Sequence, residues 1–277
     1  MWLRALWLSG RLRGIGLSGR SERTVMARVH VSSGTRDRVW VPGALLVLAA
    51  VGWWWSARMA SEMSGGMTMA DPVASVSAAG FLVGWVAMMG AMMFPAIIPV
   101  VRLYGRAAVR GTVAPVPFFV GGYLLVWTAL GVPAYLAWQA LAGPISDGAP
   151  WAARLAGAVL VVAALYQLTP LKTACLRHCR SPMSFFMRHA AHLDRPEGAV
   201  RAGATHGLIC VGCCWALMAV LVALGTMQLA WMLGLAGLIF LEKVTRFGER
   251  VALAAAPVFL AIGAALLVFP HAVTYLV

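Results

Sequence analysis

The stretch His206–Met218 has the sequence HGLICVGCCWALM. It lies inside an apolar run from Ala204 to Gly225, which is long enough to cross a bilayer at about 1.5 Å per helical residue. At about 100° per residue, one imidazole and three thiols project from one side of such a helix. These side chains are His206, Cys210, Cys213 and Cys214.

Two interpretations of this face stay open from the residues alone. Thiolates and thioethers are soft ligands that favour Cu(I) and Zn over hard cations, which indicates an intramembrane metal or redox site. Cysteine is also a small apolar residue that packs well between helices, and an imidazole near a helix start can contact water or headgroups. The second interpretation is therefore ordinary helix packing.

The composition of the whole chain agrees with the apolar character of this stretch. It is 61% hydrophobic and only 11% charged, which excludes an ordinary soluble protein. The predicted fold class is all-α, a polytopic transmembrane helix bundle, because a chain in lipid must satisfy its own backbone polar groups. We predict seven spans, with six as the alternative because the sixth is short and Pro95 and Pro99 can shorten the second. The spans are 39–57, 77–101, 116–142, 151–169, 204–224, 226–241 and 251–270.

The positive charge follows the predicted topology. The formal net charge is +13, yet 20 of the 22 Lys and Arg residues fall in 1–38, 102–114, 170–203 and 242–250. Along the chain, these basic segments alternate with the non-basic segments that connect the predicted spans. The positive-inside rule therefore places the N-terminus in the cytoplasm and the C-terminus outside. The partner of the basic segments is then the lipid bilayer and not nucleic acid.

The same pattern divides the chain into two parts. Residues 1–38 are Arg-, Gly- and Ser-rich and are predicted to be a disordered basic cytoplasmic tail. Residues 39–277 are predicted to be a single transmembrane helical domain with a Cys/His cytoplasmic loop at 170–203. Glu242 and Lys243 end the sixth span, where we expect them at the cytoplasmic edge, paired with each other or with Arg246.

Methionines gather in the second span. Four of them lie on adjoining turns of the stretch GWVAMMGAMMFP, namely Met88, Met89, Met92 and Met93. They fall at about the same membrane depth as the cysteines of the fifth span, and transporters commonly place their sites near that midplane. If the two helices touch, they form a buried sulfur cage; the alternative is that Met is an apolar filler.

Two further groups of soft ligands lie outside the predicted spans. The loop after the first span carries Met59, Met63, Met67 and Met69, either a thioether site for Cu(I) or interfacial side chains that dip into lipid. The cytoplasmic loop carries Cys175, His178 and Cys179, followed by His189 and His192, which can supply a tetrahedral metal site. The alternative for the loop is reduced, inert thiols.

Five motifs in this order carry a family resemblance. They are MMGAMMFP at 88–95, LKTACLRHCRSP at 171–182, GLICVGCCWALM at 207–218, TMQLAWM at 226–232 and LEK at 241–243. Together they make residues 76–270 resemble a bacterial family of uncharacterised, predicted metal-binding integral membrane proteins. Gln228 stands where the family pattern has Asn. The resemblance implies a multi-helix fold in a bacterial inner membrane and a metal site, but no established activity.

The hypothesis that accounts for these features is a membrane protein that binds, transports or delivers a transition metal. Copper(I) is the expected ion and zinc the second choice, with a metal chaperone or a membrane subunit as a partner. One alternative is a membrane thiol/disulfide or metal-dependent oxidoreductase that uses the cysteines of the fifth span. Another is a structural assembly subunit whose Cys and Met side chains only pack.

Overall fold

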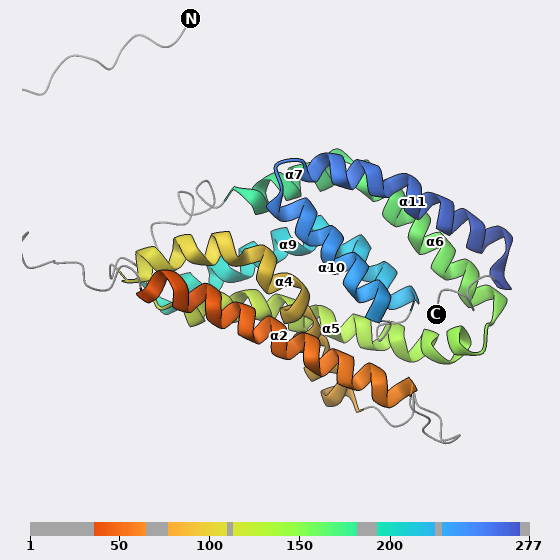
Figure 1. The fold of residues 1–277 in the computed structure, drawn as a ribbon, viewed down its shortest axis with the longest axis horizontal. Coiled ribbons are helices and arrows are strands. Elements are labelled where there is room, and N and C mark those ends of the chain that lie inside the picture. The colour runs from red at the N-terminus through yellow and green to blue at the C-terminus, as the bar shows by residue number, and fades with distance from the viewer. Residues whose placement is uncertain (1–35, 65–76, 110–112, 182–192, 225–228, 272–277) are drawn as a thin grey trace, which may run out of the picture. The chain divides into compact units, whose positions relative to one another are not determined.

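Helices account for nearly all of the chain that the computed structural model describes, which is residues 36–64, 77–109, 113–181, 193–224 and 229–271. No strand occurs among these residues, so the predicted all-α class is confirmed for them. The helices, labelled as in Figure 1, are α2 (Arg36–Ser64), α4 (Ala78–Val109), α5 (Val116–Ser146), α6 (Pro150–Gln167), α7 (Pro170–Arg180), α9 (Pro196–Leu224), α10 (Leu229–Val244) and α11 (Gly248–Val268).

Each of the seven predicted spans coincides with a helix. Five helices, α4, α5, α6, α9 and α11, are long and apolar enough to cross a membrane. Helix α10 has 16 residues and α2 is not among the five, so the count of seven spans stays a prediction. Helix α4 continues through Pro95 and Pro99 as far as Val109, so these prolines do not shorten it, which was the possibility behind the alternative of six spans.

Helix α9 lies at the centre of the helix packing. It packs most extensively on α5, and it also contacts α6, α7 and α10 (Figure 1). Helix α11 runs along α6, and α10 contacts both α4 and α11. Because α9 has neighbours on several sides, its thiols are enclosed by protein.

Glycines let α9 come close to α5. A Cβ atom on Gly203 would collide with the carbonyl oxygen of Phe119, and one on Gly122 would collide with that of Val200. Only glycine leaves room for backbones at this separation, which is how membrane helices gain packing contacts without a hydrophobic driving force. The close approach brings Tyr123 of α5 against α9.

The segment 170–203, predicted as a cytoplasmic loop, contains the first two turns of α9, from Pro196, and the short helix α7. Thr169 caps it by accepting a 3.2 Å hydrogen bond from the backbone N–H of Lys172, and Pro170 takes the first helical position. Lys172, Leu176 and Cys179 are buried, at the spacing of one helix face. That face packs on α9, so α7 lies close to the cysteines of the fifth span.

Candidate metal centre

The thiols of α9 are fully enclosed. Cys210, Cys213 and Cys214 are at most 1% exposed. The thiols of Cys213 and Cys214 donate to the carbonyl oxygen of Cys210, at 3.0 and 2.9 Å. Residues three and four positions after Cys210 reach its carbonyl because one helical turn separates them. The predicted shared face of these cysteines is thus present.

Helix α7 adds a further thiol to this group. The Sγ atoms of Cys179, Cys210 and Cys213 all lie within 4.8 Å of one another, and all three residues are buried. We call these three residues the thiol cluster. A metal lies about 2.3 Å from each thiolate sulfur, so sulfurs that share one ion lie within about 4.6 Å of each other. The thiol cluster therefore needs only a small contraction to hold a single ion.

Helix α10 brings a buried cation to the thiol cluster. The Nζ of Lys243 lies 2.7 Å from the Sγ of Cys210 and 3.6 Å from the Sδ of Met93 in α4. The hydroxyl of Tyr123 in α5 lies 3.1 Å from the same Cys210 sulfur. Side chains from three other helices thus converge on or beside Cys210.

A second buried polar group lies at the junction of α6, α7 and α10. The Nζ of Lys172 lies 2.7 Å from one carboxylate oxygen of Glu242, and the Nε2 of Gln167 donates to the other at 2.9 Å. The expectation that Glu242 and Lys243 pair with each other or with Arg246 is wrong. The physical reason is that both side chains turn inward, where Lys172 and Cys210 supply partners that α10 itself does not offer.

Cys175 lies one turn before Cys179, on the side of α7 that faces α9. It is half-buried, and a Cβ atom on Gly212 would lie 3.0 Å from its sulfur. Burial, the largest cause, and the nearby Cys213 raise the pKa of the Cys175 thiol above its ordinary value, although Lys172 acts in the opposite direction. The neutral thiol is therefore favoured there.

The structure separates the remaining predicted ligands of the cytoplasmic segment. His178 is exposed on the other side of α7, with its Nδ1 2.8 Å from the carbonyl oxygen of Ala174. His189 and His192 lie outside the described residues, as does the predicted short helix that contains them. The Cys/His site predicted for this segment therefore remains a prediction, while Cys179 joins the cysteines of α9.

His206 is buried one turn before Cys210, as its spacing predicted. Its ring centroid lies 6.1 Å from that of Tyr123 and 6.1 Å from that of Phe119. It is not one of the three residues whose ligand atoms lie within 4.8 Å of one another. Its role as a ligand stays a prediction.

The four methionines of α4 are all buried in the hydrophobic core that also contains the cysteines. Met93 reaches the thiol cluster through Lys243, whose ammonium contacts both sulfurs. Helices α4 and α9 both contact α5 and α10, but direct contact between the second and fifth helices, as predicted for the sulfur cage, stays a prediction. Met88, Met89 and Met92 lie in the core, where an apolar filler also belongs. Met59 and Met63, predicted to lie in a loop, fall within α2, which continues to Ser64; their side chains, like residues Met67 and Met69, lie outside the described part of the structure.

Sequence reasoning did not identify Lys243 and Tyr123 as neighbours of Cys210. The available signal was chemical: Lys243 is a charged residue in an apolar helix, and such residues are expensive in lipid unless they serve a site. Tyr123 carried no comparable signal, since a tyrosine within a span is more often an interface anchor.

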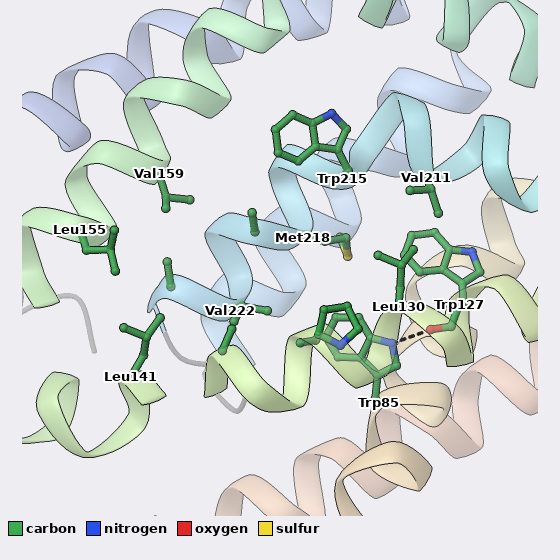
Figure 2. A pocket seen from close by; sticks show the side chains of 15 residues that line it. Trp85, Trp127, Leu130, Leu141, Leu155, Val159, Val211, Trp215, Met218 and Val222 are labelled. Atoms are coloured by element: carbon green, nitrogen blue, oxygen red, sulfur yellow. Dashed lines mark hydrogen bonds between the residues drawn. The ribbon is translucent and has the colours of Figure 1, made fainter. Parts of the chain in front are cut away.

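An apolar cavity of about 310 Å³ lies between α5, α6 and α9, apart from the thiol cluster. Figure 2 shows Trp85, Trp127 and Met218 lining it, with the Nε1 of Trp85 donating to the backbone carbonyl of Trp127 at 2.9 Å. No cysteine, histidine or charged residue is among the residues that line this cavity. It is therefore not the metal centre.

Comparison with known proteins agrees with the chemistry of the thiol cluster. Residues 82–266 match the PpoB2 family, which is described as copper chaperone. No curated protein and no solved structure matches the chain. The matched region extends from α4 into α11, and it contains every residue of the thiol cluster together with Lys243 and Met93. The resemblance to a metal-handling family is thereby confirmed, and because the match covers more than half of its length, the chain belongs to the PpoB2 family of copper chaperones.

Proposed function

We propose that this protein is an integral membrane protein that binds Cu(I) at the thiol cluster and delivers it to a partner. The observation that carries the proposal is the enclosure of three thiols, from Cys179, Cys210 and Cys213, within 4.8 Å of one another. Copper is the cargo, and the three sulfurs are its proposed ligands.

The donor set supports a soft ion. Sulfur ligands select Cu(I) and zinc, whereas Mg²⁺ and Ca²⁺ need oxygen ligands. Among the described residues, the buried carboxylate is that of Glu242, and it is engaged by Lys172 and Gln167. The thioether of Met93 lies 3.6 Å from the Nζ of Lys243 and is proposed as an additional soft ligand. Zinc is the second choice, since thiolate ligands also suit it.

The membrane part of the proposal rests on the five long apolar helices and on the placement of charge. The positive-inside rule puts the basic segments, and α7 with them, on the cytoplasmic side of a bacterial inner membrane. Half-buried Cys175 is then the thiol by which copper enters or leaves the cluster. The partner is a metal chaperone or a membrane subunit that meets the α7 side.

Copper stoichiometry tests the proposal. The protein is purified in detergent under reducing, oxygen-free conditions, loaded with Cu(I), desalted and subjected to elemental analysis. We expect about one copper per chain in the unmodified protein and a large loss in Cys179→Ser, Cys210→Ser and Cys213→Ser.

Cys214→Ser is the matched control. Cys214 is as buried as the other cysteines of α9, but it lies outside the thiol cluster, and a serine can still donate to the carbonyl oxygen of Cys210. This variant should keep its copper. Retention of copper by all three cluster variants would contradict the proposal. A metal-free protein with a redox-titratable dithiol would instead support the oxidoreductase alternative.

A further inference from the structure

Lys243 carries a buried positive charge beside the thiol cluster. Its side chain is 6% exposed. The ion pairs found in the described part of the chain are Lys172 with Glu242 and Arg177 with Glu249, and neither contains Lys243. Within the described part of the chain, the Nζ of Lys243 instead contacts two sulfur atoms, those of Cys210 and Met93.

The neighbouring carboxylate does not balance this charge. Glu242 precedes Lys243 on α10, yet its two oxygens are taken by Lys172 and Gln167 in a separate pair that is already neutral. An uncompensated charge in the interior is costly, so the thiol cluster is where the balancing negative charge belongs. Cys210 is the closest candidate, at 2.7 Å from the ammonium.

Charge balance then distinguishes the ions that the thiol cluster can hold. Two thiolates around a monovalent cation leave one net negative charge, which a single ammonium neutralises. Two thiolates around a divalent cation are already neutral and need no such partner. A buried net charge is strongly disfavoured, so the ammonium affects the two classes of ion differently.

We propose, on the basis of the function proposed above, that Lys243 is the charge partner that lets the thiol cluster hold a monovalent soft cation between two thiolates. One thiolate is that of Cys210, the second comes from Cys179 or Cys213, and the remaining sulfur of the thiol cluster binds as a neutral thiol. Lys243 donates to Cys210 and is not a ligand, and it sets the preference of the site for Cu(I) over a divalent ion of similar softness. Because it acts through Cys210, Lys243 is a positioning and specificity-determining residue.

The test compares Cu(I) and Zn(II) affinities in the full-length protein in detergent, each measured by competition with a chromophoric chelator. Lys243→Leu removes the charge and, unlike a methionine, adds no sulfur ligand beside the thiol cluster. Two unit charges about 4 Å apart at an effective dielectric constant of about 20 correspond to roughly a thousandfold in an equilibrium constant. We therefore expect Cu(I) affinity to fall at least about 100-fold, with Zn(II) affinity unchanged within about threefold or increased.

Two further variants distinguish the effect of the charge on Lys243 from a general structural effect. Lys172→Met/Glu242→Gln removes two equally buried charges whose sum is zero, and it should shift both affinities in parallel. Lys243→Arg keeps the charge and should keep the ratio of Cu(I) to Zn(II) affinity, which also tests the idea if Lys243→Leu does not fold.

Three results would overturn the role of Lys243. They are an unchanged Cu(I) affinity in Lys243→Leu, an equal loss of affinity for both ions in that variant, which marks a structural role, and a collapse of the affinity ratio in folded Lys243→Arg. An unmodified protein that binds no Cu(I) would instead overturn the proposed function itself, so the two failures are distinguishable.

Discussion

The Nζ of Lys172 lies 2.7 Å from the Oε2 of Glu242, with each side chain only 1% exposed. This ion pair joins α7 to α10. Helix α7 supplies Cys179 and α10 supplies Lys243, so the pair connects the two elements that complete the surroundings of Cys210. Gln167 donates to the other carboxylate oxygen and ties α6 to the same point.

Removal of one partner of this pair should destabilise the protein strongly. Lys172→Met leaves the Glu242 carboxylate buried without its ammonium, and loss of one member of a buried pair costs about 3–5 kcal/mol. Lys172→Met/Glu242→Gln removes both charges and should recover most of the loss. Thermal unfolding in detergent measures the effect. A double variant as unstable as the sum of the single variants would show that the two residues do not act as a pair.

The contact between α5 and α9 should not tolerate a methyl group. In Gly203→Ala the new Cβ meets the Phe119 carbonyl oxygen, which belongs to the backbone and cannot rotate away. Separating the helices should lower the unfolding midpoint and move Tyr123 away from Cys210. Gly234→Ala on α10 is the control, because that position is exposed and has nothing within 4 Å of the added Cβ. It should be neutral or stabilise by about 0.5–1 kcal/mol. Equal midpoints for the two variants would rule out a backbone contact at Gly203.

The apolar cavity should accept a larger side chain. Ala219 lines the cavity, so Ala219→Leu can place its added carbons in the space of about 310 Å³ and should change stability by less than about 1 kcal/mol. Ala163 of α6 is 0% exposed and does not line the cavity, so Ala163→Leu overpacks the core and should cost about 1–3 kcal/mol. The measurement is the thermal unfolding midpoint of each of the two variants. A larger loss at Ala219 than at Ala163 would show that the cavity is filled in the folded protein.

The reactivity of Cys175 should report its raised pKa. Only the thiolate reacts with iodoacetamide, and a pKa above the ordinary value reduces the thiolate fraction at any given pH. With the other four cysteines replaced by serine, labelling of Cys175 at pH 7 should be slower than labelling of glutathione. The pH midpoint of the labelling rate should lie above the ordinary cysteine pKa. Denaturation in detergent removes the burial that causes the shift and should return the midpoint to the ordinary value. A midpoint at or below that value in the folded protein would contradict the burial of this thiol.

Much of the architecture could be predicted from the residues. Each of the seven apolar stretches is a helix, because apolar runs of this length satisfy their backbone polar groups only as helices in lipid. Cys210, Cys213 and Cys214 share a face because their spacing matches one helical turn. The expectation that Glu242 and Lys243 pair with each other or with Arg246 was wrong. A charge at the end of an apolar helix is usually a membrane stop, and the rule contains no information about a partner on another helix.

By itself the sequence determined that the chain is helical, that soft sulfur ligands gather on particular helix faces and that the basic segments alternate with apolar ones. These properties depend on spacing and composition along a single element. Only the tertiary structure decided that Cys179 meets Cys210 and Cys213 while His178 faces outward, and that Lys243 points at a thiol. The physical reason is that helical periodicity specifies which residues share a face, whereas the neighbour that the face meets depends on how all the helices pack together.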